Sequence, residues 1–201
     1  MASLGHVAVG MCAGRAFADR GARRPRLAIA FFAGLALLPD LDYLLVALGG
    51  RNEGAFGHRG AAHSLIPPLA AALVALALGA RLKIPRSRLA LFCGLVVASH
   101  ALLDAMTTGS RGVPLLWPLS FHRFEMPWRP IPNAPCGLAY VSRLGLRVAA
   151  TEFLQFLPFL WFATRPLLVG PPCAAPGGPS PDARSRAAAP PRGHLTTSTS
   201  G

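Results

Sequence analysis

Acidic residues are scarce in this sequence, with 8 aspartates and glutamates against 20 lysines and arginines among 201 residues. Charged residues make up only 14% of the chain, whereas hydrophobic residues make up 52%. This composition argues against a soluble domain and favours an integral membrane protein. The net charge of +12 comes almost entirely from arginines in short clusters between apolar segments. Because cytoplasmic loops of membrane proteins carry such clusters, we expect no nucleic-acid partner.

Signatures of several other protein classes are also missing from the sequence. The four cysteines form no C-x-x-C pair, which argues against a disulfide framework and against a zinc–thiolate site. There is no G-x-S-x-G, P-loop or Rossmann motif. There is also no internal repeat that would indicate a transporter built from inverted repeats.

Long apolar segments indicate the fold class. A weaker amphipathic segment, 4–18, precedes four predicted membrane spans, which are 27–48, 65–80, 89–106 and 148–164. These segments predict an all-α fold, an integral membrane bundle of four to five helices formed by residues 1–169. Proline, glycine, alanine and serine dominate residues 170–201, so we expect a disordered C-terminal tail there.

The arginine distribution predicts which loops face the cytoplasm. Residues 19–26 contain four arginines and residues 81–88 contain four basic residues, whereas the longer loop 49–64 contains two. By the positive-inside rule, the two dense clusters are cytoplasmic. Within the first span, Pro39 in the sequence LPDLDY predicts a kinked or broken helix, because proline cannot donate the backbone hydrogen bond of the preceding turn.

Ionisable side chains inside or beside the apolar segments are the most informative residues. Nine such groups occur: His6, Asp40, Asp42, His58, His63, His100, Asp104, His122 and Glu152. The predicted topology brings all nine to the outer face of the membrane. Groups of this kind at membrane depth are costly and usually functional. His100 and Asp104, four positions apart, are also expected to share one face of a helix.

Imidazole and carboxylate groups without thiolates indicate the type of site. They suit a divalent metal at a catalytic centre, with zinc expected and manganese or iron as alternatives. Because there are more such groups than the four that one structural zinc requires, we expect a two-metal site. In such a site some of the groups orient the ligands or act as a general base.

Five blocks of sequence, HVAVG, LLPDLDYLL, HRGAAHSL, SHALLDAMTT and LLWPLSFHRF, occur in this order. Over residues 4–165 the chain thereby resembles the YdjM-type family of inner-membrane-bound metal-dependent hydrolases, although Ala62 replaces a threonine that the family often has. The resemblance implies a multi-pass inner membrane protein. It also implies these metal ligands: His6, Asp40, Asp42, His58, His63, His100 and Asp104. We expect catalytic roles for Asp42, His63 and Glu152.

The resemblance also implies a reaction class. The family is distantly similar to the all-helical zinc phospholipase C and single-strand nuclease group, which implies phosphoester hydrolysis. We therefore expect a membrane-bound hydrolase that acts on a phosphoester or lipid-linked substrate near the outer membrane face. Arg59, Arg111 and Arg123 are candidates to bind its phosphate oxygens. Two alternatives stay open: a proton- or metal-coupled transporter, and a non-catalytic membrane protein with a structural metal site.

Overall fold

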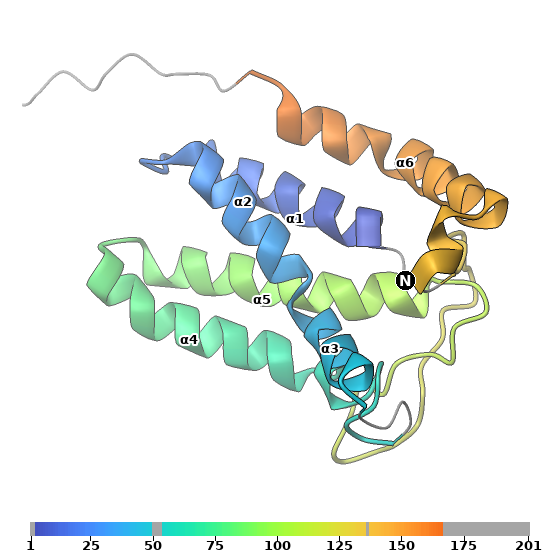
Figure 1. Cartoon of the computed structure of the whole chain (residues 1–201). Coiled ribbons are helices and arrows are strands. Elements are labelled where there is room, and N and C mark those ends of the chain that lie inside the picture. Colours follow the sequence, from blue (N-terminus) through green and yellow to red (C-terminus); the bar gives the residue numbers. More distant parts are fainter. Residues whose placement is uncertain (1–2, 50–53, 136, 167–201) are drawn as a thin grey trace, which may run out of the picture. The chain divides into compact units, whose positions relative to one another are not determined.

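Six α-helices and three short 3₁₀-helices make up the regular structure of the described residues, 3–49, 54–135 and 137–166, in the computed structural model (Figure 1). They are, in order, α1 (Ser3–Ala18), α2 (Pro25–Ala36), η1 (Leu38–Leu41), α3 (Asp42–Ala47), η2 (Ala61–His63), α4 (Ile66–Leu82), α5 (Arg86–Ala105), η3 (Gly137–Val141) and α6 (Arg143–Thr164). The described part of the chain contains no β-strand, which confirms the all-α prediction. The chain divides into Met1–Leu167 and Leu168–Gly201, and the predicted tail 170–201 lies outside the described residues.

A break at Pro39 divides the first predicted span. Helix α2 ends at Ala36, and the axis turns by 53° before the segment Leu38–Leu44. The prediction of a broken helix is therefore correct. Because the break divides one predicted span into α2 and α3, the structure has six α-helices among the described residues rather than four to five. It places Asp40 on η1 and Asp42 at the start of α3, where η1 packs against α5 and η2.

Glycines allow α1 and α2 to pack closely. A Cβ atom on Gly10 would lie 2.5 Å from the carbonyl oxygen of Phe32, and one on Gly14 would lie 2.6 Å from the Cα of Ile29. Two glycines four positions apart on one helix face let helix backbones approach each other, as in many membrane helix pairs. The same α1 also packs against α6 and α5, so it is held between three helices.

The two arginine-rich connections lie at the same end of the helices. Arg88, in the first turn of α5, donates a hydrogen bond from Nη1 to the backbone oxygen of Arg20 in the α1–α2 connection at 2.6 Å. The α4–α5 and α1–α2 connections lie at this same end in Figure 1. Both clusters therefore face the same side, as the positive-inside argument required. The loops between α3 and α4 and between α5 and α6 lie at the opposite end.

Helix lengths and hydropathy identify fewer spans than the sequence pattern predicts. Among the described residues, α5 is long and apolar enough to cross a membrane, and α2 with Leu38–Leu44 passes as a second span if the bent pair is counted as one. Helix α4 is apolar but shorter, at 17 residues. Large apolar side chains are nevertheless exposed on α4 and α6, among them Leu73 at 67% and Trp161 at 68%.

The connection between α5 and α6 is folded although it has little regular structure. Isolated β-bridges join Thr107 to Ile131 and Val113 to Phe124. The connection ends where Ser142 caps α6, its hydroxyl accepting the backbone N–H of Gly145 at 3.2 Å. This arrangement positions the described parts of the connection, 107–135 and 137–142, at the ends of the helices that carry the predicted site (Figure 1).

Candidate metal centre

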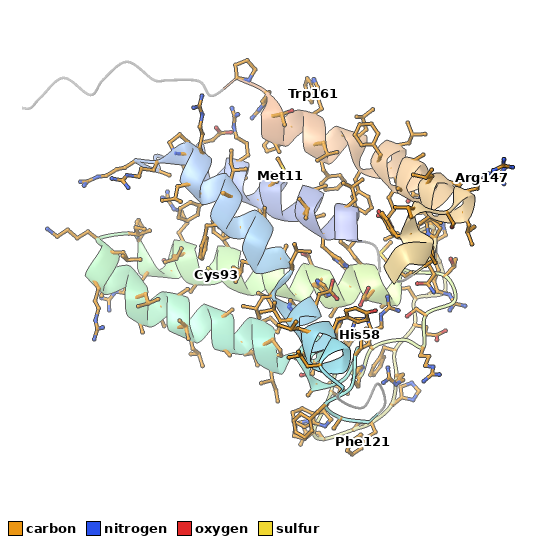
Figure 2. The ribbon with its side chains drawn as sticks, in the orientation of Figure 1. Met11, His58, Cys93, Phe121, Arg147 and Trp161 are labelled. Carbon is orange, nitrogen blue, oxygen red and sulfur yellow. The ribbon has the colours of Figure 1, made fainter. Side chains whose placement is uncertain are left out.

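All seven predicted metal ligands meet at the end of the helices opposite the arginine clusters. They come from separate parts of the chain: His6 from α1, Asp40 and Asp42 from the Pro39 break, His58 and His63 from the α3–α4 connection, and His100 and Asp104 from α5. Figure 2 shows His58 at this end, beside α3. Three overlapping groups can hold a metal ion: His6–Asp40–His100, Asp40–His58–His63 and His63–His100–Asp104.

The centre of the cluster consists of two imidazoles and two carboxylates. Nε2 of His63 lies 3.2 Å from Nε2 of His100 and 3.2 Å from Oδ2 of Asp104. Nε2 of His100 lies 3.9 Å from the same Oδ2. Oδ1 of Asp40 lies 3.4 Å from Nε2 of His100 and 3.8 Å from Nε2 of His63. His63 and His100 are fully buried and Asp104 is 2% exposed, so these polar atoms face one another rather than water.

Neighbouring oxygens orient the two central imidazoles. Nδ1 of His100 lies 2.7 Å from the carbonyl oxygen of Ala36, which accepts only from an N–H, so Nδ1 carries a proton and, in the neutral ring, Nε2 has the lone pair. Ala36 is the last residue of α2, where helix carbonyls lack partners. Asp42 contacts two histidines: its Oδ1 is hydrogen-bonded to Nδ1 of His58 at 2.8 Å, and its Oδ2 lies 3.2 Å from Nδ1 of His63, an ion-pair contact without hydrogen-bond geometry.

Arg59 connects the two carboxylate-bearing segments. Its backbone N–H donates to Oδ2 of Asp42 at 3.2 Å, and its Nη2 donates to Oδ1 of Asp104 at 2.9 Å. Its φ of 61° lies in the left-handed region, which is uncommon for a residue with a side chain and occurs often at functional sites. Oδ1 of Asp104 is thus paired, while Oδ2 is buried without a hydrogen-bond partner and points to the central imidazoles.

His6 borders the centre on the α1 side. Its ring stacks on that of His100, with centroids 3.8 Å apart and planes at 14°. Its Nε2 lies 3.7 Å from Oδ1 of Asp104, and its Nδ1 is buried without a hydrogen-bond partner. Through Asp40 and His100 it forms a metal-binding group of its own.

Carboxylates control the protonation of His63. This residue lies in the α3–α4 connection, outside the candidate membrane spans. Burial lowers the pKa of His63, but its interactions with Asp104, Asp40 and Asp42 outweigh burial and raise the pKa to about 10. Without a metal, a proton on His63 therefore compensates the surrounding negative charge. A cation that binds there has to displace this proton.

Two of the nine sequence-selected groups lie elsewhere. Among the described residues, Glu152 belongs to none of the three metal-binding groups. It is fully buried on α6, where its carboxylate interacts with the backbone N–H of Leu4 at the start of α1, but neither oxygen has a hydrogen bond of ordinary geometry. His122 is exposed on the α5–α6 connection, edge-on to the ring of Phe124.

Comparison with known proteins agrees with the sequence blocks that surround these residues. The sequence model of the YdjM inner membrane protein family matches residues 1–170. The chain belongs to the YdjM family. It is 39% identical over 171 residues to the inner membrane protein YbcI of Escherichia coli (strain K12), an alignment that covers 80% of this chain and 96% of YbcI.

Two shorter alignments agree with this assignment. The chain is 39% identical over 103 residues to the inner membrane protein YdjM of Escherichia coli (strain K12) and to that of Shigella flexneri, covering 45% of this chain and 48% of each relative. No solved structure matches the chain. Membership of the family confirms that this is an inner membrane protein, associated with the lipid bilayer.

Several contacts in and beside the cluster were not predicted from the sequence. Arg59, selected as a candidate phosphate ligand, is paired with Asp104, and Arg123 donates from Nη1 to the backbone oxygens of Arg59 and Gly112 at 3.1 and 2.9 Å. The contact between His100 and Ala36 was also missed. One available signal was Pro39 itself, because a helix that ends before a proline leaves its last carbonyls free to accept.

Proposed function

We propose that this protein is a membrane-bound, metal-dependent hydrolase whose centre holds a divalent cation on His63, His100, Asp104 and Asp40. The observation that carries the proposal is the spacing of their four facing atoms, 3.2 to 3.9 Å for the pairs given above. Ligands at 2.0–2.2 Å around a tetrahedral zinc ion lie roughly 3.3 to 3.6 Å from one another. The five measured separations therefore lie close to those that such an ion requires.

The overlap of the three groups limits how many ions can bind together. An imidazole nitrogen has one lone pair, so Nε2 of His63 or of His100 binds one ion only. A carboxylate has two oxygens and can bridge. Asp40, which is common to two of the groups, is therefore the residue that would link a second ion, with His6 or His58 as its other ligand. Zinc fits this donor set, and so do manganese and iron(II).

The chain's own residues prepare the centre for catalysis. A divalent ion held there supplies Lewis-acid chemistry, which polarises a phosphoryl oxygen and makes water a nucleophile near neutral pH. Asp42 and the carbonyl of Ala36 hold the imidazoles of His63 and His100 so that Nε2 faces the centre. Arg59 fixes Oδ1 of Asp104, so that Oδ2 remains for the ion.

Access to the centre is from the side of the α3–α4 connection. The side chains of Asp40 and His58 are 13% and 14% exposed, whereas those of His63 and His100 are fully buried. A substrate that approaches from this side meets the end of the helices opposite the arginine clusters, where a lipid-linked phosphoester would present its head group. Asp42, His63 and Glu152 remain the proposed catalytic residues, although Glu152 lies outside the metal-binding groups.

One observation favours a second function, a metal site that only stabilises the fold. Structural zinc sites are closed and have four protein ligands, and the two central histidines of this centre are closed to solvent. Both hypotheses predict bound metal, but only the hydrolase hypothesis predicts turnover of a substrate.

Purified full-length protein in detergent tests the proposal by metal analysis and by turnover of a panel of phosphomonoesters, phosphodiesters and phospholipids. We expect bound zinc, manganese or iron, and hydrolysis that chelation abolishes and metal restores. The variant Asp104→Asn should lose metal and turnover together. Stoichiometric metal with no turnover on any substrate would favour the structural site, and absence of metal after reconstitution would refute both hypotheses.

A further inference from the structure

A small pocket lies directly beside the candidate metal centre. Its volume is about 240 Å³, and Gly60, Pro114, Trp117, Phe121 and Arg123 are among its lining residues. The turn His58–Gly60 separates it from the centre: His58 belongs to a metal-binding group, while Gly60 lines the pocket. The pocket is smaller than the roughly 300–1,000 Å³ of sites that enclose a drug-sized ligand. It has room for a head group rather than for a whole lipid.

Positive charge is concentrated at this pocket. Arg123 lines it, and the guanidinium groups of Arg59 and Arg111 are close enough to affect Arg123 electrostatically. Burial lowers the pKa of Arg123, and the like charges of Arg111 and Arg59 lower it further. The two bonds that fix Arg123 to the protein, to the carbonyls of Arg59 and Gly112, both use Nη1. An arginine so placed is suited to bind a phosphate group.

Exposed apolar side chains occur on the chain segments that line the same pocket, where Phe121 is a lining residue and Phe56 and Leu119 lie within two residues of lining residues in the sequence. Phe56 is 78% exposed, Leu119 is 92% exposed and Phe121 is 72% exposed. Phe56 contacts Trp117 edge-on, with ring centroids 6.1 Å apart. Figure 2 shows Phe121 on the loops at the end of the molecule where His58 lies. Aromatic side chains on a membrane protein are typical of the level of lipid head groups, where an apolar body meets a polar tip.

We infer that this pocket binds the phosphate of an anionic phospholipid, with Arg123 contacting the phosphate and Phe56, Trp117 and Phe121 contacting the apolar part of the molecule. The inference rests on the proposed hydrolase function, because it names the substrate class that the centre receives. A lipid phosphate in the pocket is separated from the candidate metal ligands only by the turn His58–Gly60. The small volume and the exposed apolar residues beside the pocket fit a phospholipid whose head group enters the pocket while its acyl chains stay outside, in the bilayer.

Tryptophan fluorescence can measure this binding directly. In the full-length double variant Trp128→Phe, Trp161→Phe, the remaining Trp117 reports on the pocket. The detergent-solubilised protein is titrated with dioctanoyl phosphatidic acid, dioctanoyl phosphatidylcholine and inorganic phosphate. We expect saturable binding of phosphatidic acid and weaker binding of the other two. Arg123→Gln should weaken phosphatidic acid binding by about tenfold, the usual effect of a lost charge-assisted hydrogen bond.

Arg129→Gln is the matched control. Arg129 lies on the same connection and is exposed in a pair with Glu125 at 2.6 Å, so its loss should leave binding unchanged. Equal effects of the two substitutions would overturn the inference, as would inorganic phosphate binding as tightly as phosphatidic acid. Since Arg123 also holds the Arg59 carbonyl, Phe121→Ser on the exposed rim provides a second test. It should weaken phosphatidic acid binding and leave inorganic phosphate unaffected, and unchanged lipid affinity would refute the inference.

Repeating the titration after chelation separates this inference from the proposed function. Arg123-dependent lipid binding in protein that shows no metal uptake or turnover would refute the hydrolase and leave the lipid pocket standing. Metal-dependent turnover of a water-soluble phosphoester without lipid binding in the pocket would refute only the pocket.

Discussion

The two ends of the helices both bury charged side chains, but they satisfy them differently. At the arginine end, fully buried Arg15 donates to Asp19 at 2.8 Å and to the backbone oxygens of Arg165 and Pro166. Arg165 donates to Asp19 at 3.1 Å as well. These cations meet acceptors at the C-terminal end of α6, where helix carbonyls lack partners and a positive charge is favourable. The protein itself supplies the acceptors for Arg15 in this network.

At the opposite end, side-chain atoms of the types that bind metal ions face one another. Oδ2 of Asp104 is buried without a hydrogen-bond partner and Nε2 of His63 and Nε2 of His100 are only 3.2 Å apart. The buried atoms without partners at the arginine end are instead guanidinium donors, Nε of Arg88 and Nε of Arg165. A metal ion can bind to carboxylates and imidazoles, from which it displaces a proton where one is held, whereas it cannot pair with guanidinium donors. The comparison therefore identifies the histidine- and aspartate-rich end as the one whose side chains could hold a metal ion.

Matched substitutions at the two ends should give the largest difference. Asp104→Asn removes a charged ligand at one end and Asp19→Asn removes a charged partner at the other. We expect Asp104→Asn to weaken metal binding by more than about 100-fold, since even partners of metal ligands contribute 10- to 100-fold. Metal affinity in Asp19→Asn should match that of the unmodified protein. Both variants should insert into the membrane normally, and similar metal affinities in the two would remove the distinction between the ends.

The pH dependence of metal binding sharpens the comparison further. The raised pKa of His63, about 10, means that the metal-free protein keeps this proton at neutral pH. Binding has to release it, so apparent affinity should increase with pH, by up to about tenfold per pH unit for one proton. Calorimetry in buffers of different ionisation enthalpy measures the proton release. Affinity independent of pH, with no proton released, would mean that His63 is not a ligand.

Arg15→Gln should affect stability alone. The substitution removes the donor shared by Asp19 and the C-terminal carbonyls of α6. We expect a cost of about 1–3 kcal/mol, because the fully buried side chain at position 15 loses its charge-assisted hydrogen bonds. Thermal unfolding in detergent measures the loss, with metal content as the control. A lower metal content at temperatures where the variant is folded would show that the two ends are coupled through α1.

Glu152→Gln should have the smallest effect on the fold. Glu152 lies beside the start of α1, and a carboxylate near a helix N-terminus stabilises it by about 0.3–1 kcal/mol. We expect a slightly lower unfolding temperature and full metal content. Turnover distinguishes this role from the catalytic role that the sequence predicts. A decrease in turnover with metal and stability intact would support catalysis, whereas unchanged turnover would leave only the helix contact.

The convergence of the site could be predicted from the sequence because it depends on long-range rules. Arginine clusters fix which loops share a side, and helix length then fixes the height of His100 and Asp104. The break at Pro39 follows from proline's missing N–H. These rules were sufficient to bring the seven ligand candidates to one end without any knowledge of their contacts.

Individual roles could not be predicted, because they depend on local backbone angles and on loop paths. Asp40 and Asp42 are two residues apart in a broken helix, so only the actual turn decides that one faces the centre and the other faces Nδ1 of His58 and His63. The left-handed φ of Arg59 has no signature in the sequence. His122 was grouped with the site only because the predicted topology put it at the same membrane face, but in the structure its side chain is exposed on the α5–α6 connection.

A zinc titration of the metal-free, full-length protein tests the central claim most directly, with ions bound per chain as the result. We predict saturation at one or two ions per chain, together with loss of this binding in the double variant His63→Ala, His100→Ala. Binding well below one ion per chain, or unchanged binding in the double variant, would contradict a metal centre at the histidine- and aspartate-rich end.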